Sequence, residues 1–367
     1  MRISRVEAHL LSYPLPEPQG DVAKRDAMLI RVETDLGLVG YAPGPGSERT
    51  QKQILEVVKP FLEGRVLRDP DALRVHFIEA AGKQHINAYC AVEIALYDLA
   101  GKAKQLPVSE LLGGRVREHI RLYGSAGLHQ KPEQCAEEAL AIAELGFRAY
   151  KMRADLETVR QVRQAAGSDF DLMVDGQTWW HRTDIEKLAE ALAEHNIAWL
   201  EEPLPPADHQ AYRRLKDRDL VPLATGRYEP DELRYMELIL TGSVDYVQMN
   251  IASQGGYPTA TRLLSEIVHA DLKFAFQNNG TALDAIVAAQ FAVCWPEATA
   301  EWLEYPCYSA PTRAGMYPFP LAAEILCEPL EIDNGDLVVP RGPGLGVEVD
   351  ESVIQRYPYI AGHENRS

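Results

Sequence analysis

The middle of the chain alternates between short apolar runs and longer amphipathic stretches. Strands that are separated by helices need crossover connections, so this alternation predicts a parallel sheet. Eight such runs lie between residues 118 and 305, which favours a closed (β/α)8-type barrel, with a modified last unit, over an open sheet. The runs are HIRLYGSA, FRAYKMRA, FDLMVDGQ, IAWLEEPL, VPLATGRY, VDYVQMNI, LKFAFQNN and TAEWLEYP. The amphipathic stretches cover 132–145, 155–166, 184–195, 230–241 and 257–270.

The ends of the chain follow other patterns. Residues 27–41 form two β-patterned runs joined at Thr34-Asp35-Leu36-Gly37, which predicts a hairpin. Helical spacing follows at 51–64, at 70–82 and around Val92–Leu99. We therefore expect an α+β capping domain over 1–116 and a barrel over 117–305. The Pro- and Gly-rich segment 306–367 is expected to pack back on the capping domain.

Net charge narrows the range of partners. The chain has 37 Lys and Arg against 54 Asp and Glu, a formal charge of −17, which argues against general nucleic-acid binding. The five cysteines are scattered without a metal-binding spacing, and they are read as reduced thiols. The sequence shows neither a signal-peptide pattern nor an apolar run long enough for a membrane span. These observations predict a cytoplasmic protein that has no nucleic-acid or membrane partner.

Polar side chains end seven successive apolar runs. In a barrel of this type the carboxyl ends of the strands carry the chemistry, and one charged tip alone is ordinary loop chemistry. Seven tips that converge on one mouth indicate an active-site ring. They carry Lys151, Arg153, Asp175, Glu201, Glu202, Arg227, Glu229, Asn250, Gln277, Asn278 and Glu304.

The acidic tips are regularly spaced. Asp175 and Glu201 are 26 residues apart, and Glu201 and Arg227 are again 26 apart. Two carboxylates on neighbouring strand tips repel each other and need a cation. Mg²⁺ suits oxygen ligands, whereas the alternative is that Arg227 and Lys151 neutralise the pair directly.

These motifs resemble the enolase superfamily, in particular its mandelate racemase/muconate lactonizing enzyme branch. The resemblance lies in AVEIALYDLAGKAKQLPVSELLGG, VETDLGLVGY, WLEEP, VDGQ and NGDLVVPRGPGLGVEVD, which occur in order along nearly the whole chain. It implies a capping domain on a modified TIM barrel. It further implies a Mg²⁺-dependent enzyme that abstracts the proton α to a carboxylate, followed by racemisation or loss of water. A small carboxylate such as a sugar acid is the implied substrate, and a homo-oligomer the implied assembly.

The resemblance also suggests roles for individual residues. Asp175 and Glu201 match the first two metal ligands, and Glu304 matches the acid that hydrogen-bonds the substrate carboxylate. Lys151 and Arg153 occupy a Lys-x-Lys strand end that supplies a base, and Lys151 is the better candidate because Arg stays protonated.

Three positions depart from the family pattern. Arg227 stands where the third metal ligand is expected, and Asn250 and Gln277 stand where an Asp–His dyad is expected. In one model Glu229 replaces the missing ligand, since it lies two residues beyond Arg227 on the same face if the strand continues. In the other, the guanidinium of Arg227 occupies the metal position and pairs with Asp175 and Glu201.

Several alternatives remain beside the lyase or isomerase interpretation. His129 and His181 are candidate substitute acid/base groups, and Lys24 and Arg25 are candidate contacts to an anionic substrate. Lys151 is also compatible with a Schiff-base barrel enzyme. The missing dyad and third ligand are compatible with a non-catalytic, ligand-binding descendant.

Overall fold

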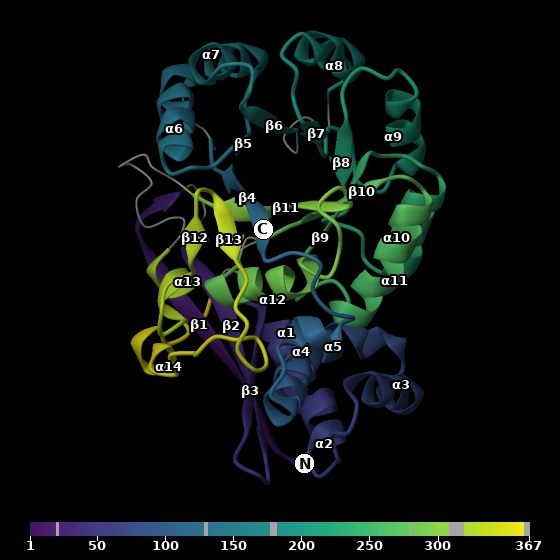
Figure 1. Ribbon diagram of the computed structural model, residues 1–367, viewed down its shortest axis with the longest axis vertical. Coiled ribbons are helices and arrows are strands. Elements are labelled where there is room, and N and C mark those ends of the chain that lie inside the picture. Colours follow the sequence, from purple (N-terminus) through teal and green to yellow (C-terminus); the bar gives the residue numbers. More distant parts are fainter. Residues whose placement is uncertain (20–21, 128–130, 177–181, 279, 308–318, 363–367) are drawn as a thin grey trace.

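The computed structural model describes residues 1–19, 22–127, 131–176, 182–278, 280–307 and 319–362. It has two packed parts, an antiparallel sheet with helices at the amino end and a closed parallel barrel above it (Figure 1). The predicted fold class, a modified TIM barrel with an α+β capping domain, is confirmed. Of the described helices, none is both long and apolar enough to cross a membrane.

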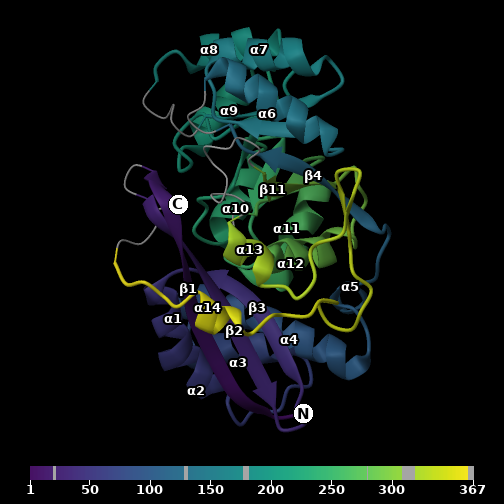
Figure 2. The same cartoon turned by 90° about the vertical axis from the view of Figure 1, so that its left-hand side faces the viewer.

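The capping domain is built on a three-stranded sheet in the order β1-β2-β3. The predicted hairpin at Thr34–Gly37 is present between β2 and β3, closed by Thr34 and Leu38. The long β1–β2 hairpin extends from this domain toward the barrel (Figure 2). The elements are β1 (Ile3–Gln19), β2 (Val22–Thr34), β3 (Val39–Pro45), α1 (Glu48–Gln53), a π-helical turn (Ile54–Val58), α2 (Lys59–Leu62), α3 (Pro70–Ala81), a 3₁₀ turn (Lys83–His85), α4 (Ile86–Lys104) and α5 (Val108–Leu111).

The eight predicted strands all form, and they close into a barrel because β11 pairs with β4. One side chain from each strand fills the barrel interior, with Trp199 packed against Tyr123 and Tyr246 at ring-centroid distances of 5.4 and 4.9 Å. This apolar layer is the floor on which the polar strand tips stand. The strands are β4 (His119–Ser125), β5 (Ala149–Met152), β6 (Asp171–Asp175), β7 (Trp199–Glu201), β8 (Leu223–Thr225), β9 (Tyr246–Met249), β10 (Lys273–Phe276) and β11 (Ala300–Pro306).

Helices surround the barrel, and three of those described begin with an aspartate cap. Asp155, Asp208 and Asp231 each accept a hydrogen bond from the third residue beyond them, which satisfies a backbone N–H at a helix start. Two helices were missed by the sequence pattern, the short α9 and the almost wholly apolar α12, which is buried along its length. The helices are α6 (Pro132–Glu144), α7 (Leu156–Ala166), α8 (Ile185–Ala193), α9 (His209–Lys216), α10 (Glu232–Leu240), α11 (Gly256–His269) and α12 (Ala282–Ala292).

The carboxyl-terminal segment contacts both parts of the molecule. Strand β13 pairs antiparallel with β4 of the barrel. Farther along, Glu351 accepts hydrogen bonds from Arg31 and Tyr41 of the capping domain, and Leu11 bridges to Pro358. This segment therefore ties the two domains together (Figures 1 and 2). Its elements are α13 (Pro320–Glu324), β12 (Ile332–Asp333), β13 (Asp336–Val338) and α14 (Val353–Arg356).

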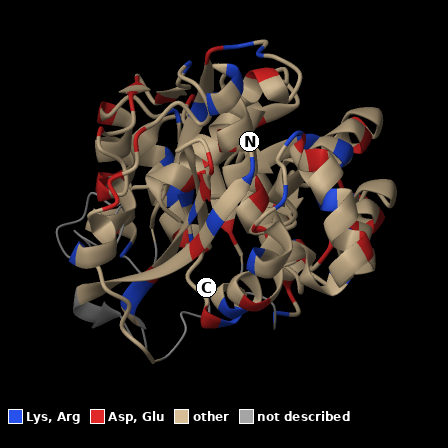
Figure 3. Ribbon diagram, turned by 90° about the horizontal axis from the view of Figure 1, so that it is seen from below, with Lys and Arg blue, Asp and Glu red and all other residues tan. Residues whose placement is uncertain are grey.

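The acidic residues are not concentrated in one region of the fold. In the view of Figure 3, acidic and basic segments are interspersed along the helices. Many of them pair at the surface, as Arg218 does with Glu186 at 2.6 Å and Arg262 with Glu232 at 2.6 Å. Such exposed pairs contribute little to stability, typically below about 1 kcal/mol each. The charges that matter for chemistry are the buried ones.

Candidate active site

A lysine at the end of β5 bridges two carboxylates from distant parts of the barrel. The Nζ atom of Lys151 lies 3.0 Å from Glu201 Oε1 on β7 and 2.8 Å from Glu304 Oε1 on β11. All three side chains are buried. Burial opposes the ammonium charge, but the two carboxylates outweigh it and raise the pKa of Lys151 well above its usual range. Lys151 is therefore a fixed cation in this state.

Arg153, the other predicted cation on this strand end, pairs with Asp175. Arg153 Nε donates to Asp175 Oδ2 at 2.8 Å. Asp175 and Glu201 are aligned partners on the adjacent strands β6 and β7, as their spacing suggested. The structure thus brings together Lys151, Arg153, Asp175, Glu201 and Glu304 at one mouth of the barrel.

Glu201 is held by donors on three sides. Besides Lys151, it accepts hydrogen bonds from Gln248 Nε2 at 2.8 Å and from Trp199 Nε1 at 3.2 Å, both on Oε2. Burial nevertheless raises the pKa of this carboxyl, with the charges of Asp175 and Glu304 adding to the rise and Lys151 opposing it. Glu201 is thus fixed in orientation by protein donors alone.

Glu304 likewise has protein donors on both oxygens. Ser125 Oγ donates to Oε1 at 2.7 Å, and the backbone N–H of Asn278 donates to Oε2 at 3.2 Å. Ser125 and Gln248 were not identified from the sequence as site residues. A signal was available for Gln248, because it is a polar residue inside an apolar run, close to the strand end that is followed by Asn250.

Arg227 follows the end of β8, beside the tip of β7. Its backbone carbonyl accepts a hydrogen bond from Gln254 Nε2 at 2.8 Å, which fixes the loop. The charges of Tyr228, Glu304, Glu202 and Asp175 act on its guanidinium, and together they raise its pKa although burial opposes this. The cation therefore stands within electrostatic reach of the acidic tips.

Glu229 lies elsewhere, and the structure does not support its prediction as a replacement ligand. Strand β8 ends at Thr225, and a turn closed by the Glu229 N–H and the Gly226 carbonyl at 3.0 Å follows it. Alternation along a strand no longer applies there, so Glu229 does not share the face of the site. Its carboxylate instead contacts His209 Nε2 at 2.7 Å in a buried pair.

The two amide positions have different surroundings. Asn250 Oδ1 accepts from the N–H and the hydroxyl of Ser253 at 3.0 and 3.1 Å, so it caps the following turn. Gln277 is 3% exposed, and within the described residues neither its Oε1 nor its Nε2 has a hydrogen-bond partner. Buried amides are rarely left so, which makes Gln277 a candidate ligand contact.

Other candidate residues are placed less favourably or lie beyond what is described. Lys24 is buried, pairs with Asp26 at 2.9 Å and lies over the Tyr359 ring at 4.5 Å, so it is not presented to a substrate. His129 and His181 lie outside the described residues.

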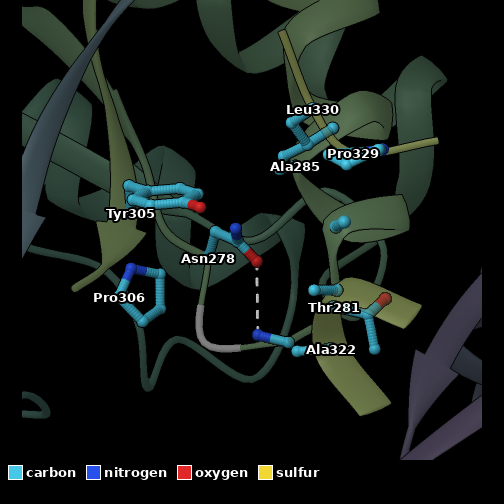
Figure 4. Close-up of a pocket in the computed structure, with 11 residues that line it drawn as sticks. Asn278, Thr281, Ala285, Tyr305, Pro306, Ala322, Pro329 and Leu330 are labelled. Atoms are coloured by element: carbon cyan, nitrogen blue, oxygen red, sulfur yellow. Dashed lines mark hydrogen bonds between the residues drawn. The ribbon is translucent and has the colours of Figure 1, made fainter. Parts of the chain in front are cut away.

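A pocket lies on the outer side of the barrel wall, between β11, α12 and the carboxyl-terminal segment (Figure 4). Tyr305 is its only titratable lining residue among those described. Its other walls are mainly small apolar side chains, among them Ala285, Ala322 and Leu330, with Asn278 at its edge. This pocket lacks the charged groups that the barrel mouth provides.

The donors at the mouth do not fit a Mg²⁺ ion held by three carboxylates. Mg²⁺ requires near-octahedral oxygen ligands, yet Asp175 and Glu201 are each engaged by a cation, and Arg227 stands at the third position. Across the described part of the chain, no three His, Cys, Asp or Glu side chains are grouped as a metal site.

Two family models cover most of the chain. Residues 3–113 match the mandelate racemase/muconate lactonizing enzyme N-terminal domain, and residues 134–353 match the enolase C-terminal domain-like family. Members of the enolase superfamily bind Mg²⁺. In this chain, by contrast, Arg227 stands in place of one carboxylate, and Asp175 and Glu201 are paired with cations.

Similar proteins of known activity or structure span nearly the whole chain. A D-galactarolactone cycloisomerase from Agrobacterium fabrum is 26% identical, with 97% of this chain and 99% of the relative covered. A D-xylonate dehydratase from Haloferax volcanii is 28% identical, covering 90% and 85%. A crystal structure of an enolase superfamily member from Polaromonas sp. JS666 matches with a TM-score of 0.88 at 28% identity, over 99% of both chains.

The two relatives of known activity are an isomerase and a lyase, so the chain is an enzyme of one of these two classes. The matched models account for both domains of the fold. The chain belongs to the mandelate racemase/muconate lactonizing enzyme branch of the enolase superfamily.

Proposed function

We propose that this enzyme removes the proton α to the carboxylate of a small acid sugar and completes either a dehydration or an isomerisation. The observation that carries the proposal is Lys151, a buried cation held between Glu201 and Glu304 at the mouth of the barrel. Arg153 and Arg227 add two further positive charges at the same mouth. These three cations offset the carboxylates of Asp175, Glu201 and Glu304, and they supply fixed donors for a substrate that is an anion and becomes more negative during reaction.

The chemistry follows from where charge develops. An α-proton of a carboxylate is very weakly acidic, because its removal places a second negative charge on the carboxylate oxygens. Donors that are already fixed in a water-poor site stabilise this charge without having to reorganise. The protonated Lys151 is suited to that task, and Arg227 offers a planar fork of donors that matches a carboxylate.

Proton transfer needs an acceptor as well as a cation. Since the pKa of Lys151 is raised, its ammonium keeps its proton and stabilises charge rather than exchanging a proton with the substrate. We therefore assign Lys151 to electrostatic stabilisation. The carboxylates of Asp175, Glu201 and Glu304 are the described groups at the mouth that can accept the α-proton. The same raised pKa disfavours a Schiff base at Lys151, which needs a neutral amine.

The substrate class is supported by the relatives and by the amides of the mouth. The two curated relatives act on a sugar lactone and a sugar acid, as their names state. Gln277, with both amide atoms buried and unpartnered among the described residues, provides a donor and an acceptor for a hydroxyl group. The predicted Mg²⁺ ion at Asp175, Glu201 and Glu229 is not part of this proposal, because Glu229 contacts His209 instead.

The experiment is α-proton exchange. The purified enzyme is incubated in D₂O with a library of sugar acids, and deuterium at the α-carbon is measured by mass spectrometry and proton NMR. We expect at least one acid to exchange or turn over, and the Lys151→Met variant to exchange it far more slowly. If no acid exchanges while the protein is folded, the proposed reaction is wrong.

A further inference from the structure

Arg227, a cation, stands at the mouth where the family pattern has its third metal-binding carboxylate. The charge at this position is therefore the opposite of the one expected. Arg227 follows β8. Asp175 and Glu201 end the two preceding strands of the barrel, β6 and β7. A guanidinium stays protonated at any physiological pH. A divalent cation placed between the same strand tips would therefore meet a fixed positive charge.

The two remaining acidic tips are already neutralised by the protein. Arg153 donates to Asp175 at 2.8 Å, and Lys151 lies 3.0 Å from Glu201 and 2.8 Å from Glu304. With Arg227, three cations face the three carboxylates Asp175, Glu201 and Glu304. Binding Mg²⁺ would require breaking these buried pairs and leaving Lys151 or Arg153 without its carboxylate, which is costly in a buried site.

The position of Arg227 is supported by its surroundings. Gln254 Nε2 reaches both the Gly226 and the Arg227 carbonyls, at 3.2 and 2.8 Å, and so anchors the turn that carries the side chain. Gly226 adopts a φ of +142° and has no room for a side chain, since a Cβ would lie 2.2 Å from the Gln248 carbonyl oxygen. The backbone that presents Arg227 is thus tightly specified.

We propose that Arg227 takes the place of the divalent cation in this enzyme, and that Arg227 and Lys151 bind the substrate carboxylate directly, without Mg²⁺. Arg227 provides the planar, two-pronged contact to the carboxylate, and Lys151 provides the second charge. This inference rests on the proposed function for the identity of the ligand as a carboxylate. The inference that Mg²⁺ is not bound does not depend on the substrate. It rests only on the cations that already face the carboxylates at the mouth.

The test is a calorimetric titration of MgCl₂ into protein that has been treated with EDTA and dialysed. The wild-type protein is compared with the variants Asp175→Asn and Arg227→Glu. Arg227→Lys, which keeps the cation, is the matched control. We expect no saturable heat across the millimolar range for wild type or R227K. We expect R227E, which adds a third carboxylate, to gain saturable binding within the same concentration range.

Saturable Mg²⁺ binding by wild type that disappears in D175N would overturn the proposal, and this comparison does not require R227E to fold. Circular dichroism melts show whether each variant is folded.

A second arm separates this inference from the proposed function. Titration of D-xylonate into EDTA-treated wild type is expected to give binding that Arg227→Met weakens at least tenfold and that MgCl₂ leaves unchanged. Binding that requires MgCl₂ would overturn the inference but leave the reaction class standing. Absence of α-proton exchange with every acid would overturn the reaction class but leave the Mg²⁺ result standing.

Discussion

Two buried clusters of charge in this molecule contain similar residues and differ in how their polar atoms are satisfied. One is the barrel mouth, with Lys151 between Glu201 and Glu304. The other joins the domains, where Arg74 of α3 lies 2.7 Å from Glu93 of α4 and 2.9 Å from Thr259 Oγ1 of α11. At this junction the guanidinium donates to four protein acceptors, the others being Cys90 and the Gly255 carbonyl.

The barrel mouth, unlike the junction, has the features of a ligand site. At the junction Arg74 donates only to protein acceptors, and Glu93 has one paired oxygen, Oε2, although its Oε1 has no partner among the described residues. These contacts hold the capping domain against the barrel. The mouth gathers three cations and also keeps Gln277 buried with neither amide atom partnered among the described residues. A protein retains such a group at a cost in stability when a ligand uses it.

The largest effect is expected from the lysine of the mouth. Lys151→Met removes the cation shared by Glu201 and Glu304, and we expect kcat/KM to fall about 10³–10⁴-fold in a steady-state assay. Lys151→Arg keeps the charge but is too basic to accept a proton. If charge is what Lys151 provides, K151R retains measurable activity; activity as low as that of K151M would contradict the electrostatic role.

The junction should respond in stability rather than in catalysis. Burial raises the pKa of Glu93 to about 8, with Arg74 opposing the rise. At pH 9, where Glu93 is ionised in the wild type, Arg74→Met leaves its buried carboxylate without a cation, so we expect the free energy of unfolding to fall by about 3–5 kcal/mol in urea titrations. The turnover of the folded fraction is expected to stay unchanged. A folded R74M protein with normal stability would show that the two clusters differ less than proposed.

The pH dependence of stability offers a third contrast. Burial, together with the charges of Glu201 and Asp175, raises the pKa of Glu202 from 4.5 to about 8. The unfolded chain releases this proton near pH 4.5 and the folded protein near pH 8, so wild-type stability falls across that window. We expect Glu202→Gln to gain roughly 2–4 kcal/mol relative to wild type between pH 4.5 and 8, with no further gain above pH 8.

That result is checked by urea titrations at half-unit pH steps. A stability difference between E202Q and wild type that does not change with pH would mean that Glu202 is ionised in the folded protein.

The smallest effects come from removing one polar group in each cluster. Gln277→Leu replaces an unpartnered buried amide, so we expect unfolding free energy to rise by about 1 kcal/mol and hydroxy-acid affinity to fall about tenfold. Thr259→Val removes an acceptor of Arg74 and should lower stability by about 1 kcal/mol without changing affinity. Thermal melts and calorimetry measure both, and changes of the same sign would contradict the comparison.

The barrel and its acidic tips could be predicted because they depend on local patterns. Each strand run ends in a polar residue, and the aligned pairing of Asp175 with Glu201 follows from equal spacing along adjacent strands. The pairing of Lys151 with Glu304 could not be derived, because it depends on barrel closure between β11 and β4, which brings together residues far apart in sequence.

Glu229 shows where sequence reasoning fails. Its assignment assumed that β8 continues past Arg227, so that residues two apart share a face. The strand instead ends at Thr225, and Gly226 with its positive φ turns the chain away. A glycine before Arg227 was visible in the sequence, but the conformation that it adopts depends on the close approach of the Gln248 backbone.

Fixed protein cations, rather than Mg²⁺, are proposed to support carbanion chemistry at this mouth. The direct measurement is the rate of α-deuterium incorporation into a reactive sugar acid by EDTA-treated enzyme, with and without added MgCl₂. We expect equal rates under both conditions, and loss of exchange in R227M. Exchange that is absent in EDTA and restored by MgCl₂ would contradict this proposal.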